Sequence, residues 1–350
     1  MINGKIGIGL IGCGTIARVR HAPEYAANPA CRLVGCHDVS RERADSLARD
    51  FGCTAFDTAE ALLADPRVDA VSICTANGTH AAMSIQALGA GRHVLCEKPM
   101  ATSTRDAREM IETAGRADRI LMIGHNQRFL KGHRKAHDLL RSGMLGRVLS
   151  FRTLFTHAGP DQWVKDRTGP LWFFDPAIAC FGCGGDLGIH KADLVQWLLG
   201  DPVVEVGALA ATRHKTGADG RPIALEDTLH ALLRTAGGIP GTLEAGWTNY
   251  GPEENATIFF CENGVLRLYE QGAADVVWQG ATGETAEYHF HDRSTNERQL
   301  ASGVIDAFIS SIADGKEPPV TGQDGYGALA VIEACIRSSG TGRREVVETL

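Results

Sequence analysis

The first 38 residues carry the pattern that most restricts what this chain can fold into. An apolar run, Lys5–Ile11, is followed at once by Gly12–Ala17 with the sequence GCGTIA, and a second apolar run, Cys31–Cys36, leads to Asp38. Glycines between a strand and a helix permit a tight turn and leave the amides at the helix N-terminus open to an anion. An acidic residue about 20 residues further on, at the end of the next strand, can accept hydrogen bonds from a ribose. The pattern therefore predicts a dinucleotide-binding unit rather than a purely structural glycine turn.

Each small residue of this unit has its own expected role. Gly12 permits the tight turn, Gly14 lets backbone amides approach a pyrophosphate, and Ala17 lets the helix pack close to the strand. The residues of the unit that we expect at the coenzyme are Gly12, Gly14, Thr15, Ile16, Ala17, Asp38 and Arg41.

The choice of coenzyme depends on the residues around the end of the second strand. Asp38 favours NAD, because its carboxylate would repel the additional 2′-phosphate of NADP. Arg41 and Arg43 follow closely, and one of them could instead bind that phosphate. We therefore expect NAD, with NADP as the alternative.

Length and composition restrict the class of protein. A chain of 350 residues is longer than one hydrophobic core usually supports, which favours two domains. The net charge of −7 argues against a nucleic-acid or anionic-membrane partner, and no apolar run is long enough to span a bilayer. Ten cysteines lie mostly in apolar segments, which is typical of reduced thiols in a cytoplasmic enzyme. Cys180 and Cys183 form a Cys-x-x-Cys pair without a matching second pair, so we expect no metal; a redox-sensitive or metal-binding pair is the alternative.

The pattern of apolar residues changes once along the chain. Residues 1–125 alternate short apolar segments with segments of helical spacing, which predicts a doubly wound parallel sheet. The segments of helical spacing are Arg41–Phe51, Ala59–Ala64, Ala81–Leu88 and Thr104–Ala117. After residue 126, period-two apolar strands predominate, and Glu262-Asn263-Gly264 between two of them indicates a hairpin. We therefore expect an α/β protein, with a Rossmann dinucleotide-binding domain over residues 1–125. A second α/β domain with a largely antiparallel sheet is expected over residues 126–350.

Ligands of doubly wound sheets bind at the carboxyl ends of the strands, so the residues that follow each predicted strand are candidate site residues. Besides Gly12–Ala17 and Asp38, these positions hold Thr75-Ala76-Asn77, Glu97-Lys98-Pro99 and His125-Asn126. A lysine at such a strand end, beside a nicotinamide, can donate a hydrogen bond to a substrate hydroxyl and favour its alkoxide. The alternative is a surface turn whose proline ends the strand.

A second candidate site lies in the segment GGDLGIHKAD at residues 184–193. On a helix, Asp186, His190 and Asp193 would share one face. Gly188 inside a helix costs about 1 kcal/mol relative to alanine, and such a cost often marks a close approach of the backbone. Histidine can accept and return a proton near neutral pH, and a neighbouring carboxylate can orient it. The alternative is an exposed polar face with an incidental ion pair.

Together these motifs resemble those of the Gfo/Idh/MocA oxidoreductases, and the similarity extends over essentially the whole chain. The resemblance implies a Rossmann domain, a C-terminal α/β domain whose open sheet serves oligomerisation, and dehydrogenation of sugars or cyclitols. A homo-oligomer, either a dimer or a tetramer, is implied as well. Some members carry a tyrosine where this chain has His190, so the match is to the histidine branch that includes inositol dehydrogenases.

The resemblance also assigns roles to single residues. Lys98, Asp186 and His190 match the catalytic residues of the inositol-dehydrogenase-like members. His190 would remove the proton of a secondary hydroxyl, Lys98 would stabilise the alkoxide, and Asp186 would orient His190 while a hydride passes to the nicotinamide. Further coenzyme contacts are implied for Thr75, Asn77, His80, Glu97 and Lys98. The residues that we expect at the substrate are Lys98, Asn126, His157, Trp163, Trp172, Asp186 and His190.

Three functions are compatible with these motifs. The first is a reversible NAD(P)-dependent dehydrogenase of a sugar, an anhydrosugar or an inositol. The second is an NAD-dependent glycosidase of the same fold, which oxidises, eliminates and re-reduces its substrate. The third is a catalytically silent regulator that senses a dinucleotide. The presence of Lys98, Asp186 and His190 together favours an enzyme over a sensor.

Overall fold

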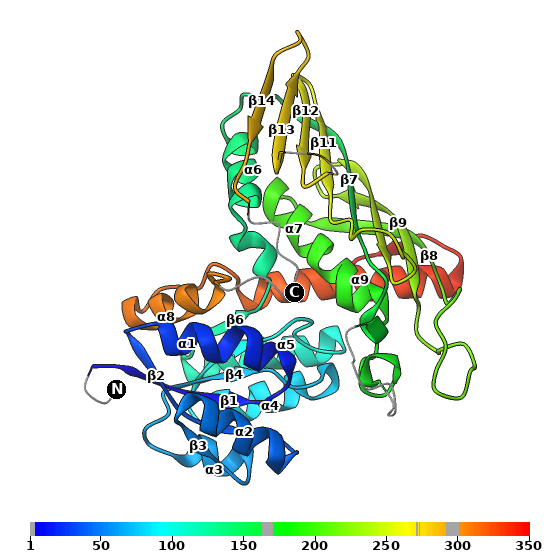
Figure 1. The fold of residues 1–350 in the computed structure, drawn as a ribbon. Coiled ribbons are helices and arrows are strands. Elements are labelled where there is room, and N and C mark those ends of the chain that lie inside the picture. Colours follow the sequence, from blue (N-terminus) through cyan, green and yellow to red (C-terminus); the bar gives the residue numbers. More distant parts are fainter. Residues whose placement is uncertain (1–3, 163–170, 271, 273, 292–300) are drawn as a thin grey trace. The chain divides into compact units, whose positions relative to one another are not determined.

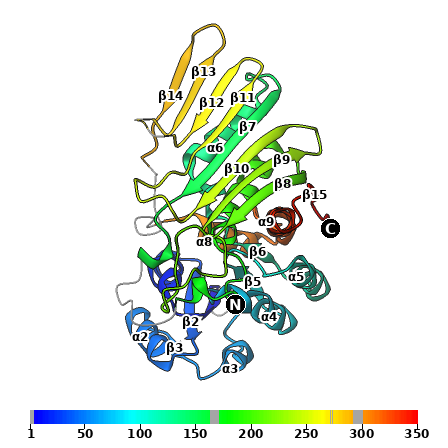
Figure 2. The same cartoon turned by 90° about the vertical axis from the view of Figure 1, so that its right-hand side faces the viewer.

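The computed structural model describes residues 4–162, 171–270, 272, 274–291 and 301–350. The chain divides into two compact units, Met1–Asn126 with Ser294–Tyr326 (the first unit) and Gln127–Arg293 with Gly327–Leu350 (the second unit). Each unit has its own β-sheet, and Figures 1 and 2 label the strands and helices. The predicted α/β fold, with one parallel and one largely antiparallel sheet, is confirmed.

The first unit contains a parallel sheet with the strand order β3-β2-β1-β4-β5-β6, which is that of a doubly wound Rossmann fold. Its strands are β1 (Ile6–Ile11), β2 (Cys31–His37), β3 (Thr54–Ala55), β4 (Ala70–Ile73), β5 (His93–Cys96) and β6 (Leu121–Ile123). Its helices are η1 (Ala17–His21), α1 (Ala22–Ala27), α2 (Arg41–Phe51), α3 (Ala59–Ala64), α4 (Asn77–Gly89), α5 (Thr104–Ala117) and α8 (Val304–Asp314). All six residues of β1 are buried, as expected for a central strand covered on both faces.

The segment that precedes α8 returns to the first unit. Ser302 donates its backbone N–H and its hydroxyl to the buried carboxylate of Glu24, over distances of 2.8 and 2.9 Å. Asn28 donates to Asp306 at the start of α8. The predicted boundary after residue 125 did not assign this later segment to the first unit. Contacts between residues 278 positions apart cannot be predicted from a local sequence pattern. The division of the chain into functional domains stays a prediction.

The second unit contains a sheet with the strand order β14-β13-β12-β11-β7-β10-β9-β8-β15. The strands β7 and β10 pair in parallel, whereas the other neighbours are antiparallel. The strands are β7 (Val148–Thr156), β8 (Val203–Ala211), β9 (Thr228–Thr235), β10 (Pro240–Gly246), β11 (Thr257–Cys261), β12 (Gly264–Leu268), β13 (Val276–Gly280), β14 (Thr285–Tyr288) and β15 (Glu345–Val346). The predicted hairpin at Glu262-Asn263-Gly264 is confirmed, because Cys261 pairs with Gly264.

One face of this sheet is covered and the other is open. Buried and exposed residues alternate along β9 and β10, as expected when only one face packs on a core. Figure 2 shows helices behind the sheet, and no helix of the described residues lies across its near face. The helical segments of the unit are η2 (Asn126–Phe129), α6 (Lys131–Arg141), η3 (Pro160–Gln162), η4 (Trp172–Phe174), η5 (Gly184–Gly188) and α7 (Ile189–Leu199). The last helix, α9 (Gly322–Thr341), begins in the first unit and continues into the second.

Candidate active site

The glycine turn after β1 has the geometry expected of a coenzyme cradle. Gly12 has φ +94°, and a Cβ atom added to it would lie 2.6 Å from the backbone of Cys74, so no side chain fits. A Cβ added to Gly14 would meet nothing within 4 Å. The space beside Gly14 at the helix N-terminus is therefore open to a ligand, which fits a pyrophosphate. Ala17 is fully buried, as close packing of helix and strand requires.

Asp38 follows β2 and is bonded to the turn itself. Its Oδ2 accepts the backbone N–H of Cys13 at 2.8 Å, and its Oδ1 accepts Nη2 of Arg43 at 2.7 Å. Burial alone would raise the pKa of Asp38, but the hydrogen bonds from Arg43, Cys13 and Ser40 outweigh it and lower that pKa. Arg41 instead forms ion pairs with Asp45 and Asp57. The guanidinium next to Asp38 is thus that of Arg43.

His80 joins the loops that follow β4 and β5. Because α4 begins at Asn77, four residues earlier than the helical spacing indicates, His80 lies on the first turns of this helix. Its Nδ1 lies 2.8 Å from the carbonyl oxygen of Pro99, and its Nε2 lies 3.0 Å from that of Thr75. Burial lowers its pKa more than the two carbonyl groups raise it. A neutral imidazole donates to one of these carbonyls, so His80 links the two loops.

The loop after β5 presents Lys98 at the edge of the sheet. Lys98 is half-buried, whereas the preceding Glu97 is buried and points inward. Oε1 of Glu97 lies 2.9 Å from Nε2 of His21, and Oε2 accepts the backbone N–H of Lys98 at 3.2 Å. Burial alone would raise the pKa of Glu97, but the hydrogen bond from His21 and the nearby positive charges bring that pKa to about 2. The predicted coenzyme contact of Glu97 stays a prediction.

In the second unit, Asp186 and His190 lie on consecutive turns of one helical segment. Asp186 belongs to the π-helical turn η5, and His190 follows on α7; both are buried. Oδ2 of Asp186 accepts a hydrogen bond from Nε1 of Trp247 at 3.1 Å. Trp247 is fully buried, so its indole holds the carboxylate in place. We did not expect this role from the sequence, because 61 residues separate the two side chains.

Glycine is required just before η5 and within it. A Cβ on Gly182, just before the turn, would lie 1.9 Å from the carbonyl oxygen of Glu226, and one on Gly185 would lie 2.5 Å from Cβ of Phe181. The Glu226 carboxylate accepts the backbone N–H groups of Gly182 and Gly184. Such π-helical turns are rare and occur frequently at functional sites.

Asp193, which the spacing placed on the face of Asp186 and His190, has a different partner. Arg128 binds it with two parallel hydrogen bonds, Nη2 to Oδ1 at 2.6 Å and Nε to Oδ2 at 2.9 Å. Both side chains are buried. This pair anchors α7 to the chain segment that enters the second unit.

Phe155 lies beside two groups of this helix. Its ring centroid is 5.9 Å from that of His190 and 6.0 Å from Nζ of Lys191. Lys191 is fully buried, with Nζ 3.4 Å from Oγ1 of Thr257. Burial lowers the pKa of Lys191 from 10.5 to about 7. Lys191 was not among the predicted site residues; a lysine within an otherwise apolar helical stripe was the signal that could have shown it.

The remaining predicted substrate residues have different surroundings. Nδ1 of His157 accepts the backbone N–H of Gly159 at 2.9 Å. Trp172 stacks on Phe173 with 3.8 Å between ring centroids. Asn126 is half-buried after β6. Trp163 lies outside the described residues.

The predicted residues thus form two groups. Asp38, Thr75, Glu97 and Lys98 follow parallel strands of one sheet and lie at its carboxyl edge. Asp186 and His190 lie on one helical segment of the other unit. The expected meeting of Lys98 with His190 stays a prediction.

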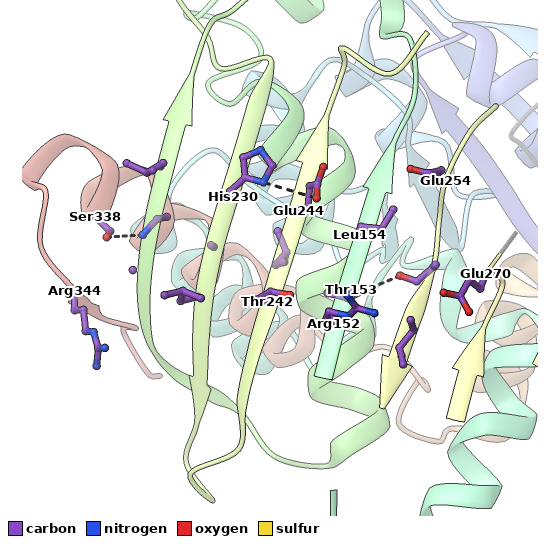
Figure 3. A pocket seen from close by; sticks show the side chains of 18 of the residues that line it. Arg152, Thr153, Leu154, His230, Thr242, Glu244, Glu254, Glu270, Ser338 and Arg344 are labelled. Atoms are coloured by element: carbon purple, nitrogen blue, oxygen red, sulfur yellow. Dashed lines mark hydrogen bonds and ion pairs between the residues drawn. The ribbon is translucent and has the colours of Figure 1, made fainter. Parts of the chain in front are cut away.

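A large hollow lies elsewhere in the second unit, on the open face of its sheet (Figure 3). Its volume is about 1010 Å³, and none of the predicted site residues lines it. His230 and Glu244 approach each other there, with 3.8 Å between Nδ1 and Oε2. Leu209 and Leu232 also line it and are 75% and 61% exposed. An open apolar surface of this kind is typical of a protein interface.

Within the described residues, no helix is long and apolar enough to cross a membrane.

Comparison with known proteins gives matches along the whole chain. Residues 6–125 match the oxidoreductase family with an NAD-binding Rossmann fold, GFO_IDH_MocA, and residues 133–267 match the GFO/IDH/MocA C-terminal domain. The 1,5-anhydro-D-fructose reductase of Ensifer adhaerens is 28% identical over 345 residues, covering 97% of this chain and 98% of that protein. The inositol 2-dehydrogenase of Gluconacetobacter diazotrophicus is 28% identical over 351 residues, covering 99% and 97%. The crystal structure of GenD2 from gentamicin A biosynthesis, in complex with NAD, has a TM-score of 0.84 and 26% identity, covering 100% of this chain and 98% of that one.

Proposed function

We propose that this chain, which belongs to the Gfo/Idh/MocA family of NAD-binding oxidoreductases, oxidises a secondary hydroxyl of a sugar, an anhydrosugar or an inositol. The names of its relatives support this substrate class, since they include a reductase of an anhydrosugar and a dehydrogenase of inositol. The observation that carries the proposal is the Asp186–His190 segment, a buried acid and a buried imidazole on consecutive turns, with the acid held by Trp247.

The coenzyme supplies a hydride acceptor when it is bound. Gly12 and Gly14 would hold its pyrophosphate, because the turn has no room for a side chain at Gly12 and open space beside Gly14. Asp38 would accept hydrogen bonds from the adenosine ribose. We propose NAD as the preferred coenzyme, because the pKa of Asp38 is lowered, so its carboxylate stays charged and repels a 2′-phosphate. Arg43, already bonded to Asp38, is the side chain that could offset this repulsion.

The substrate hydroxyl would lose its proton to His190. Lys98 would donate a hydrogen bond to the same oxygen and stabilise the alkoxide as it forms. Asp186, with one oxygen bonded to Trp247, would use its other oxygen to orient His190 and to stabilise the protonated imidazole. The proposal requires Lys98 and His190 to act on one hydroxyl group.

We further propose a homo-oligomer that forms through the open face of the second unit's sheet. Leu209 and Leu232 would be buried on association, and the polar residues around them would pair across the interface. Burial of such exposed leucines stabilises a dimer by about 1.5–3 kcal/mol for each side chain.

The test is a panel of monosaccharides, anhydrosugars and inositols assayed with NAD and with NADP, following formation of the reduced coenzyme. His190→Ala and Lys98→Ala should each lower kcat by about 10²–10⁴-fold, since each removes one proton-transferring or charge-stabilising group. Their Kd for NAD should stay within about twofold, because neither residue belongs to the pyrophosphate cradle.

The matched control is His137→Ala, which removes a histidine stacked on Trp197 at 4.5 Å on a neighbouring helix. It should keep normal turnover. Full activity of the His190 or the Lys98 variant would reject the catalytic assignment. Absence of coenzyme reduction by every polyol, with either coenzyme, would reject the dehydrogenase function.

A further inference from the structure

A chain of buried polar side chains in the first unit connects the helix after the glycine turn to the loop that carries Lys98. The hydroxyl of Tyr25 lies 2.7 Å from that of Ser72, and Ser72 lies 3.1 Å from Nδ1 of His21. Nε2 of His21 lies 2.9 Å from Oε1 of Glu97. Tyr25, Ser72 and His21 are fully buried, and Glu97 is 7% exposed. Four polar groups are thus removed from water, and hydrogen bonds link each of them to the next.

The hydrogen bonds of this chain can all run in one direction. The Tyr25 hydroxyl donates to Ser72, the Ser72 hydroxyl donates to Nδ1 of His21, and Nε2–H of His21 donates to Glu97. Tyr25, Ser72 and His21 then donate one hydrogen bond each, and Glu97 only accepts. A neutral imidazole can accept from Ser72 at Nδ1 and donate to Glu97 from Nε2. The second oxygen of Glu97 accepts the backbone N–H of Lys98 at 3.2 Å, so the chain ends on the main chain of the proposed catalytic lysine.

The local helix geometry brings His21 to this position. Residues Ala17–His21 form a π-helical turn, which is wider than an α-helical turn. Two consecutive side chains of this turn reach the same carboxylate, because Nη1 of Arg20 also lies 3.9 Å from Oε1 of Glu97. The turn begins three residues after Gly14, so the segment that would hold the pyrophosphate is continuous with the one that holds Glu97.

We propose that His21 is a positioning residue of the active site. It holds the Glu97 carboxylate, Glu97 in turn fixes the main chain at Lys98, and the coenzyme-binding helix is thereby tied to the loop that presents the lysine. The inference rests on the proposed dehydrogenase function, because it assigns His21 a role through Lys98.

The electrostatic surroundings of Glu97 make the role of His21 measurable. Arg20 and His21 face the carboxylate from η1, Cys74 faces it from the end of β4, His80 from α4, and Cys96 and Lys98 flank it on its own strand and loop. Burial raises the pKa of Glu97, and the hydrogen bond from His21 is the largest of the effects that lower it. Without His21 the carboxyl group should take up a proton at a higher pH than in the wild type.

The experiment compares His21→Phe, Glu97→Gln and the double variant. In His21→Phe, the ratio of its kcat to that of the wild type should fall about tenfold between pH 8 and pH 5, as Glu97 becomes protonated. In the double variant this ratio should be independent of pH, because no carboxyl group is left to titrate. His21→Gln retains a side-chain N–H donor and should restore most of the ratio at pH 5. Glu24→Gln is the control, since it alters an equally buried glutamate of the same unit that is bonded to Ser302.

Thermal melting gives a readout that does not depend on turnover. The pKa of Glu97 is about 2 in the wild type against 4.5 ordinarily, so its ionisation stabilises the fold above pH 4.5, and that contribution is lost as the pH falls toward 2. In His21→Phe the pKa of Glu97 should be higher than in the wild type, so ionisation of Glu97 should stabilise this variant less. The gap in Tm between the wild type and His21→Phe should therefore widen from pH 4 to pH 7, and it should not widen between Glu97→Gln and the double variant.

A Tm gap that stays constant with pH would overturn the proposal, as would a pH-independent kcat ratio for folded His21→Phe in an active enzyme. Failure of the wild type to oxidise any polyol is a different result: it would reject the proposed function and with it the role of Lys98.

Discussion

At the residue scale, Lys191 shows the electrostatic cost of a buried cation. Its ammonium group has one hydroxyl within 3.4 Å and the ring of Phe155 at 6.0 Å, and neither neutralises a charge. Burial lowers its pKa from 10.5 to about 7, and Glu253 opposes this shift only in part. The same ammonium, together with burial, lowers the pKa of His133 to about 3. Such perturbed groups are typical of functional sites and reduce stability.

Lys191→Met is expected to stabilise the protein, by about 2–4 kcal/mol at pH 6. Between pH 7 and 10.5 the unfolded chain binds more protons at this residue than the folded chain, so wild-type stability rises with pH across that window. Below pH 7 lysine is protonated in both states, and its burial is fully unfavourable. The advantage of Lys191→Met should therefore shrink from pH 7 toward pH 10.

Denaturant unfolding at pH 6, 8 and 9.5 measures this effect. Lys316→Met, which alters a lysine whose side chain is 75% exposed, should change stability by less than about 0.5 kcal/mol at each pH. An equal gain from Lys191→Met at pH 6 and pH 9.5 would contradict the depressed pKa.

Among the secondary-structure elements, the π-helical turns η1 and η5 both carry site residues, Ala17 and His21 on η1 and Asp186 on η5, and each continues into an α-helix. The sequence predicted a helix beginning near Gly185 and a cost for Gly188, but it did not predict the wider turn. The reason lies in distant residues, since Glu226 binds the amides of Gly182 and Gly184. The crowding at Gly185 comes from Phe181, close by in the chain.

Gly185→Ala is expected to destabilise the protein by about 1–3 kcal/mol and to lower kcat, because its Cβ would lie 2.5 Å from Cβ of Phe181 and would shift the turn that holds Asp186. Gly115→Ala in α5 is the matched control, because an added Cβ meets nothing within 4 Å there. It should instead gain about 0.5–1 kcal/mol from the better helix propensity of alanine. Calorimetric melting checks both, and equal stability of the two variants would show that η5 tolerates a side chain.

Other elements were predictable to different degrees. The bounds of α2, α3 and α5 agree with the sequence prediction, because each has a serine or threonine N-cap that is visible in the sequence: Ser40, Thr58 and Ser103. By contrast, α4 has no side-chain cap, and the sequence predicts it only from Ala81 onward. The strands β8, β13 and β14 were not predicted, because few of their residues are buried and their apolar pattern is weak.

For the molecule as a whole, the open face of the second unit's sheet is the surface that the proposed homo-oligomer would bury. Side chains of β8, β9, β10 and β7 line the hollow there (Figure 3). Alternation along β9 places Leu232 on this face and Leu233 in the core, where it is 3% exposed. A single strand can therefore serve both the fold and an interface.

Leu232→Glu is expected to reduce the size of the proposed homo-oligomer, because association would bury an unpaired carboxylate on each copy. Light scattering after size-exclusion chromatography measures the molar mass. Met144→Glu changes an exposed residue that does not line the hollow and should leave the mass unchanged. A monomeric wild type, or a Leu232→Glu protein of unchanged mass, would reject assembly through this face.

Short-range features of the sequence were enough to predict the α/β class, the coenzyme-binding turn and the family: apolar periodicity, glycines beside a strand end, and the short motifs that contain Lys98, Asp186 and His190. The local motifs also identified Lys98, Asp186 and His190 as candidate catalytic residues. Only the tertiary structure showed which side chains bind the polar residues in and around the candidate site. Tyr25, Ser72 and Glu97 meet around His21, Trp247 binds Asp186, and Arg128 takes Asp193. Hydrogen bonds between residues 47 to 76 positions apart leave no local pattern, because they arise only when the sheet brings its strand ends together.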